Sequence, residues 1–93
     1  KLMKCTGIRE GYLMAKVAKS LGLKVMIGCM TESSCGIAAA AQLAPLADWV
    51  DLDGHFLLAD DPFEGLGFED GAVQLSEQNG LGVFPKHLSW ADQ

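Results

Sequence analysis

Three extended segments alternate with two helical segments in the first 55 residues, and this order constrains the fold more than any other feature. The extended candidates are Lys1–Cys5, Val25–Met30 and Trp49–Asp53, and apolar residues recur with helical spacing over Ile8–Leu21 and Cys35–Ala47. Each connection is long enough for a parallel crossover. Consecutive βαβ units and an α/β fold are therefore predicted for residues 1–55.

Local signals define the ends and faces of the two helices. Gly22 follows the first helix as a C-cap, and Ser33 or Ser34 is a suitable N-cap for the second. In the first helix one face carries the larger apolar side chains, which are Ile8, Tyr12, Leu13, Val17 and Leu21. We expect this face to pack on the sheet.

The second half of the chain has a different pattern. Gly65–Phe68 and Ala72–Leu75 flank an Asp-Gly pair, which predicts a β-hairpin. Gly80–Val83 is a last extended candidate, and 86–93 is a tail without a pattern. We therefore expect one domain over 1–85, with βαβαβ over 1–55 and a hairpin plus an extended segment over 56–85.

A parallel sheet of three strands leaves unpaired backbone groups on both outer strands. Either another chain completes such a sheet, or the sequence is part of a larger α/β protein. We expect completion by association of identical chains into a homo-oligomer.

Composition excludes several partners and compartments. The net charge is −5, and the six basic residues of positions 1–24 have helical or strand spacing without interleaved aromatic residues. This pattern argues against nucleic-acid binding, and no apolar run approaches the roughly 18 residues of a membrane span. The three cysteines form no C-x-x-C pair, which favours a reducing, cytoplasmic location.

Candidate chemical groups follow the extended segments. Lys1 at a desolvated strand end could serve as a general base, or it could be an ordinary solvated lysine. The segment Cys29–Ser34 runs from a strand into a helix start, where backbone N–H groups could hold an anion or a serine could simply cap the helix. Asp51, Asp53 and His55 alternate onto one face of an extended chain. Because two neighbouring carboxylates repel each other, the pair predicts a bound cation, which could be an ammonium group or a metal ion. The alternative is a solvated or helix-capping pair of acids.

Five segments together resemble the dipeptide epimerases of the enolase superfamily. They are Lys1–Lys4, Lys24–Ser34, Gly36–Ala41, Asp51–Gly54 and Gly80–Val83. The resemblance implies a partial (β/α) barrel, covering the sixth to eighth strands at the C-terminal end of a TIM-type barrel domain. Two departures are Thr6, where the family motif has the first of two glycines, and the 86–93 tail.

The resemblance also implies roles for single residues. Lys1 matches one of two acid/base lysines that move the α-proton of a dipeptide such as L-Ala-L-Glu, and Asp51 and Asp53 match the pair that holds the α-ammonium group. Met30 and Glu32 are expected to contact the substrate. The family uses Mg²⁺, but the carboxylates that bind it and the second lysine lie on earlier strands, with no counterpart in these residues.

Three functional hypotheses follow. The first is a C-terminal fragment of a dipeptide epimerase, an isomerase that binds a dipeptide-like ligand, without activity as an isolated chain. The second is a small stand-alone hydrolase of esters or phosphoesters, with Zn²⁺ or Mn²⁺ bound by Asp51, Asp53 and His55 in an oligomer. The third is a non-catalytic module that associates with itself.

Overall fold

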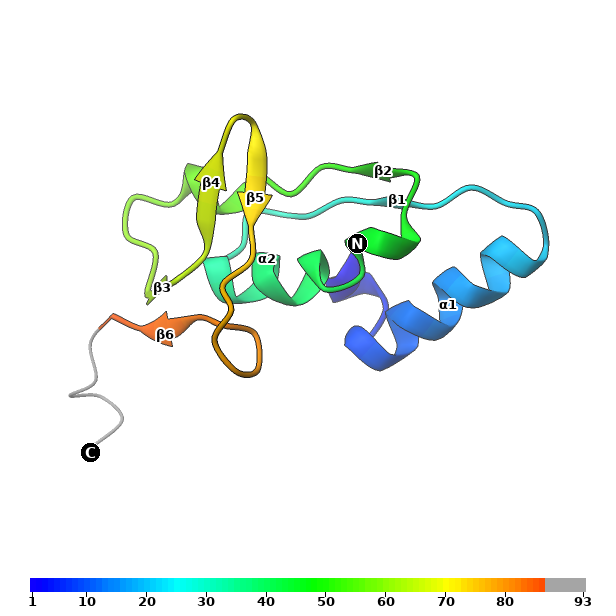
Figure 1. Cartoon of the computed structure of the whole chain (residues 1–93), viewed down its shortest axis with the longest axis horizontal. Coiled ribbons are helices and arrows are strands. Elements are labelled where there is room, and N and C mark those ends of the chain that lie inside the picture. Colours follow the sequence, from blue (N-terminus) through cyan, green and yellow to red (C-terminus); the bar gives the residue numbers. More distant parts are fainter. Residues whose placement is uncertain (87–93) are drawn as a thin grey trace.

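A short parallel sheet forms one layer of the fold, with the helices on one side of it (Figure 1). The structure, a computed structural model, describes residues 1–86. Strand β1 (Met26–Ile27) pairs in parallel with β2 (Trp49–Val50), and helix α2 (Ser34–Ala41) forms the crossover between them. This pairing confirms the predicted parallel βαβ unit, with strands shorter than the apolar runs that contain them.

Helix α1 (Ile8–Ser20) agrees with the predicted helix. Its end is fixed by Gly22, which has a φ of 78°. The Gly22 N–H donates to the Lys19 carbonyl at 3.0 Å, and the Leu23 N–H donates to the Ala18 carbonyl at 2.9 Å. These are the two hydrogen bonds of a Schellman motif, so the predicted glycine C-cap is confirmed.

The predicted packing face of α1 is wrong. Its large apolar side chains are exposed, with Val17 at 58% and Leu21 at 70%. The buried side is made of Gly11 and Ala15, and a Cβ on Gly11 would lie 2.9 Å from Leu2 Cδ1. The helix therefore approaches its neighbours through its smallest residues, and its larger apolar stripe has no cover among residues 1–86.

Helix α2 ends earlier than the predicted Ala47. Pro45 has no N–H and its ring would clash with the carbonyl of residue 41 in a continuing α-helix. The chain instead forms a short 3-10 helix over Ala44–Leu46.

The predicted strand Lys1–Cys5 is also wrong, because Leu2–Lys4 forms a 3-10 helix. The Lys4 N–H donates to the Lys1 carbonyl and the Cys5 N–H to the Leu2 carbonyl, both at 2.9 Å. A strand needs a paired neighbour to satisfy its backbone. No such neighbour pairs with this segment in residues 1–86, so its backbone bonds locally.

The predicted hairpin is confirmed. Strands β4 (Gly67–Glu69) and β5 (Ala72–Gln74) are antiparallel. The turn residues Asp70 and Gly71 have φ values of 52° and 79°. Positive φ at both central positions is typical of the type I′ turn that the Asp-Gly pair favours.

A second antiparallel pair joins β3 (Phe63–Glu64) to β6 (Phe84–Pro85). The predicted extended piece Gly80–Val83 is wrong, since Gly80 and Gly82 have φ values of 68° and 74°. These left-handed residues turn the chain before the strand begins at Phe84. Of the predicted tail, Lys86 donates its N–H to the Pro62 carbonyl at 2.9 Å; 87–93 lie outside the described residues.

The core is small and lies between α2 and the parallel β1–β2 sheet. Its buried residues are Ile27, Ile37, Ala40, Ala41, Leu43 and Leu52, and Ile37 is fully buried. Within the described part of the chain, no helix is long and apolar enough to span a membrane.

Candidate functional site

Lys1 lies over the carboxyl end of β1. Its Nζ donates to the thioether Sδ of Met30 at 3.4 Å. The lysine side chain lies beside Gly28, where a Cβ would be 3.9 Å from Lys1 Cε, an ordinary contact distance. The structure therefore brings together two of the predicted site residues, Lys1 and Met30, which are 29 positions apart in sequence.

Glu32 braces the loop that carries Met30. Its Oε2 accepts a hydrogen bond from the Met30 N–H at 3.0 Å. A Cβ on Gly36 would lie 2.7 Å from Glu32 Oε1, so the carboxylate folds back over the first turn of α2. Glu32 thus holds the shape of the loop, and its predicted contact with a substrate stays a prediction.

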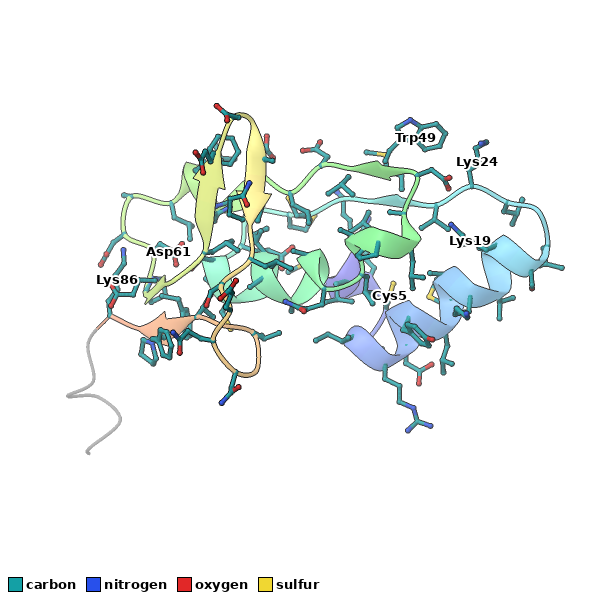
Figure 2. All side chains as sticks on the ribbon, in the orientation of Figure 1. Cys5, Lys19, Lys24, Trp49, Asp61 and Lys86 are labelled. Carbon is teal, nitrogen blue, oxygen red and sulfur yellow. The ribbon has the colours of Figure 1, made fainter. Side chains whose placement is uncertain are left out.

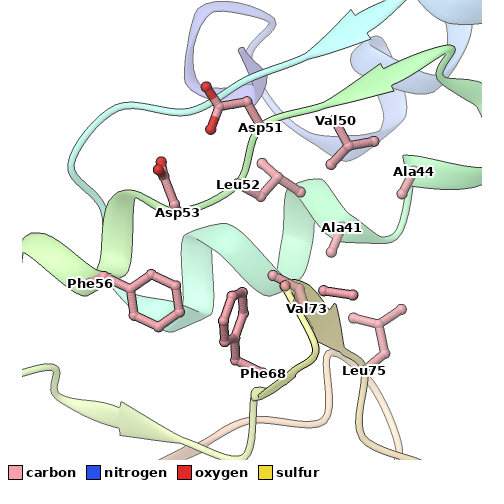
Figure 3. Close-up of a pocket in the computed structure, with 12 residues that line it drawn as sticks. Ala41, Ala44, Val50, Asp51, Leu52, Asp53, Phe56, Phe68, Val73 and Leu75 are labelled. Atoms are coloured by element: carbon pink, nitrogen blue, oxygen red, sulfur yellow. The ribbon is translucent and has the colours of Figure 1, made fainter.

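Asp51 and Asp53 follow β2 on either side of a buried leucine. The Asp51 N–H donates to the Ile27 carbonyl at 2.8 Å, which continues the pairing with β1. Leu52 is 5% exposed and points into the core, whereas both aspartates are exposed. Their carboxylates point to the same side, away from the Phe56 and Phe68 rings (Figure 3). The predicted shared face of the two acids is present.

Gly54 joins the two strand ends. A Cβ at this position would overlap the Met30 carbonyl oxygen and would lie 3.1 Å from Cys29 Sγ. The segment after Asp53 is therefore in direct contact with the segment that carries Met30. Lys1, Met30, Asp51 and Asp53 all lie at the carboxyl ends of the parallel strands, where α/β folds place ligands.

His55 does not join the two aspartates. The prediction assumed an extended chain over 51–55, but Gly54–Leu57 is a 3-10 helix. His55 is half-buried and its ring lies 4.2 Å from the Phe56 ring, with Nδ1 buried and without a hydrogen-bond partner. Residues 1–86 contain no group of three His, Cys, Asp or Glu side chains that could hold a metal. The structure thus does not support the alternative Zn²⁺ or Mn²⁺ site.

A cavity of about 650 Å³ lies beside the acid pair (Figure 3). The hairpin β4–β5 covers it, and Leu52 and Val73 are among its apolar lining residues. The rings of Phe56 and Phe68 meet edge to face, with centroids 4.8 Å apart. The cavity is therefore mainly apolar and carries the two acids at its border.

Sequence analysis did not single out Asp61. Its carboxylate accepts hydrogen bonds from the Ser34 N–H at 3.1 Å, from the Ser34 hydroxyl at 3.2 Å and from the Phe63 N–H at 3.1 Å. The bond to Phe63, two positions along, belongs to the Asx turns that Asp commonly forms, so it could have been predicted. The contact with Ser34 crosses 27 positions and has no local signal.

Asp61 also replaces the predicted serine cap. Ser33 occupies the N-cap position of α2, but its side chain makes no capping hydrogen bond. Burial alone would raise the pKa of Asp61, yet the hydrogen bonds from Phe63 and Ser34, together with the nearby charge of Lys86, hold this pKa below its usual value. Asp61 and Lys86 lie at the end of the molecule far from α1 (Figure 2).

Comparison with known proteins connects this site to a family. Residues 1–88 match the family described as Enolase C-terminal domain-like. This chain belongs to that family. The match covers both the Lys1 segment and the Asp51–Asp53 segment, which the sequence resemblance had singled out.

Two curated relatives are epimerases. An L-Ala-D/L-Glu epimerase from Bacteroides thetaiotaomicron is 49% identical over 83 residues, which are 89% of this enolase-family chain and 22% of the relative. An L-Ala-D/L-amino acid epimerase from Flavobacterium johnsoniae is 52% identical over 83 residues, covering 89% and 25%. The chain thus spans about a quarter of the length of these relatives.

Solved structures show the same fold relationship. The dipeptide epimerase from Methylococcus capsulatus, complexed with Mg and the dipeptide L-Arg-D-Lys, is 42% identical with a TM-score of 0.81, over 87% of this chain and 24% of that one. A substrate-liganded L-Ala-D/L-Glu epimerase from Bacillus subtilis is 28% identical with a TM-score of 0.77, over 85% and 23%. The predicted α/β fold and partial barrel therefore agree with dipeptide epimerase structures.

The Mg²⁺ of the family does not fit the described residues. Mg²⁺ sites need oxygen ligands in octahedral geometry, usually with one or two carboxylates plus substrate oxygens. Residues 1–86 bring no cluster of metal-capable side chains together. The described residues of this enolase-family chain therefore do not form a Mg²⁺ site by themselves.

Proposed function

We propose that this chain supplies one acid/base lysine and the ammonium-binding pair of a dipeptide epimerase. The observation that carries the proposal is the contact of Lys1 Nζ with Met30 Sδ at 3.4 Å. It places the lysine at the same sheet end as Asp51 and Asp53. The relatives named as epimerases support the substrate class.

Each of these residues has a defined task in a 1,1-proton transfer. In its neutral form the Lys1 amine accepts the α-proton of the C-terminal residue of a dipeptide from one face, and inversion then needs a proton delivered to the opposite face. In its ammonium form Lys1 delivers the proton to its own face when the other epimer reacts. Asp51 and Asp53 hold the α-ammonium group of the dipeptide through charge-assisted hydrogen bonds. Met30 contacts the Lys1 amine through its thioether sulfur and so fixes the direction of the lysine side chain.

We further propose that the isolated chain does not catalyse the reaction. Epimerisation needs an acid/base group on each side of the α-carbon, and it needs stabilisation of the enolate. The chain spans about a quarter of the length of its relatives, and the resemblance assigns the second lysine to earlier strands without a counterpart in these residues. Incubation with L-Ala-L-Glu and Mg²⁺ in D₂O should therefore give no deuterium at the α-carbon above background.

A chimera tests the function directly. The 83 matched residues of the Bacteroides thetaiotaomicron relative are replaced by this chain, and α-proton exchange of L-Ala-L-Glu is followed by NMR in D₂O. The chimera should exchange the α-proton. Its Lys1→Ala variant should exchange it at least about 100-fold more slowly, whereas its Lys4→Ala variant should keep the exchange rate of the parent chimera. An active Lys1→Ala chimera would refute the catalytic role and favour a non-catalytic module.

A further inference from the structure

Asp61 connects the C-terminal β3–β6 ribbon to the start of α2. Three donors reach its carboxylate: the Ser34 N–H, the Ser34 hydroxyl and the Phe63 N–H, all within 3.2 Å. Ser34 is 3% exposed, so its N–H and hydroxyl have little access to water. Buried donors without a partner are costly, which makes this carboxylate necessary for the local structure.

Asp61 holds Ser34, which lies at one end of the loop over residues 29–33 that carries Met30. The other end, β1, is fixed by its pairing with β2. Between these two anchors, Met30 contacts Lys1 and is braced by Glu32. With Ser34 released, the loop would keep the Glu32 brace, the contact with Gly54 and the hydrogen bond from the Ile37 N–H to the Ser33 carbonyl at 3.1 Å, but it would lose its link to the β3 segment.

We propose that Asp61 is a positioning residue for the Lys1–Met30 contact. It acts by capping α2 from 27 positions away and thereby fixing the loop over residues 29–33. The relevance of this positioning to epimerisation rests on the proposed function, but the positioning itself is a property of the isolated chain and is tested there.

The test compares NMR spectra of the isolated parent chain with those of Asp61→Ala, Asp61→Asn and the control Asp60→Ala. In Asp61→Ala the Met30 methyl signal and the loop amides should shift, and hydrogen exchange at Ser34 should become about tenfold faster. The amides of the β4–β5 hairpin should not change. Asp61→Asn keeps an acceptor oxygen and should move the Met30 signals back toward the parent, and Asp60→Ala should match the parent.

Two results would overturn the inference. Unchanged Met30 signals in Asp61→Ala, despite lost protection at Ser34 and Phe63, would show a cap without a positioning effect. Loss of protection throughout the chain in both Asp61 variants, hairpin included, would show a role in global stability only. Failure of the proposed function would be seen separately, as an inactive chimera carrying the parent sequence.

Discussion

Gly54 and Met30 lie so close that a Cβ on Gly54 would overlap the Met30 carbonyl oxygen. This contact joins the segment after β1, which carries Met30, to the segment after β2, which carries the acid pair. Gly54→Ala should force the two segments apart and lower the free energy of unfolding by about 1–3 kcal/mol, as for other overpacked sites. Urea denaturation measures this loss.

Gly28→Ala is the matched control for that substitution. A Cβ on Gly28 meets only the Lys1 side chain at 3.9 Å, which is an ordinary contact. Its effect on the urea midpoint should be small. Equal midpoints for both variants would mean that the two strand ends can separate without cost.

Much of the fold follows from local signals. The Asp70-Gly71 turn depends on two residues that tolerate positive φ and the Gly22 C-cap on one, so the sequence alone predicts them. The acid pair was also predictable, because Leu52 marks the buried side of the chain and strand alternation places its neighbours opposite.

The remaining differences come from contacts between distant segments. Lys1–Cys5 has the composition of a strand, but a strand forms only where another strand pairs with it. The bond between Asp61 and Ser34 joins segments 27 positions apart, and the position of His55 depends on where the 3-10 helix after Asp53 begins. The spacing of apolar residues along the sequence contains no information on the pairing of Lys1–Cys5, on the bond between Asp61 and Ser34, or on where this 3-10 helix begins.

Acid should destabilise the chain through Asp48 and Asp61. The Val25 N–H donates to Asp48 Oδ2 at 2.8 Å. This bond lowers the pKa of Asp48 below its usual value of 3.8, and the charges of Lys19 and Lys24 lower it further, although partial desolvation acts in the opposite direction. The pKa of Asp61 is also lowered, as described above.

The sign of the effect follows from these two directions. A carboxyl whose pKa is lower in the folded state gives stability that is present above the unfolded-state pKa and is lost as the pH falls through the folded-state value. The urea concentration at the unfolding midpoint of the parent should therefore decrease as the pH is lowered below about 4, which is near the unfolded-state pKa of Asp. A double variant, Asp48→Asn with Asp61→Asn, should start lower near pH 7 and fall less. Parallel curves would contradict this assignment.

Asp53→Asn should leave stability nearly unchanged. Asp53 is exposed and makes no capping hydrogen bond to the 3-10 helix that it precedes, so removal of its charge breaks no described contact and relieves repulsion from Asp51. The free energy of unfolding should change by no more than about 0.5 kcal/mol, which is typical of surface substitutions. The melting temperature should therefore stay nearly constant or rise slightly. Asp61→Asn, which alters a capping carboxylate, should lower it. A clear drop for Asp53→Asn would identify a structural aspartate.

The uncovered face of the β1–β2 sheet leads to a prediction about association. Met26 and Trp49 are opposite each other in register and are 60% and 57% exposed. Trp49 lies on the side of the strands that is turned away from α1 (Figure 2), and Lys24 Nζ is 5.9 Å from its ring. Parallel sheets are normally covered on both faces, so we expect isolated chains to associate through this face.

Light scattering at micromolar concentration should give a mass above that of one 9.9 kDa chain. Met26→Ser with Trp49→Ser should move the mass toward the monomer, because the variant removes the two largest apolar groups of the exposed sheet face. Leu57→Ser is the control: Leu57 is 75% exposed but belongs to the 3-10 helix after Asp53, away from this face. A monodisperse parent monomer, or an equal effect of both variants, would show that the sheet face does not drive association.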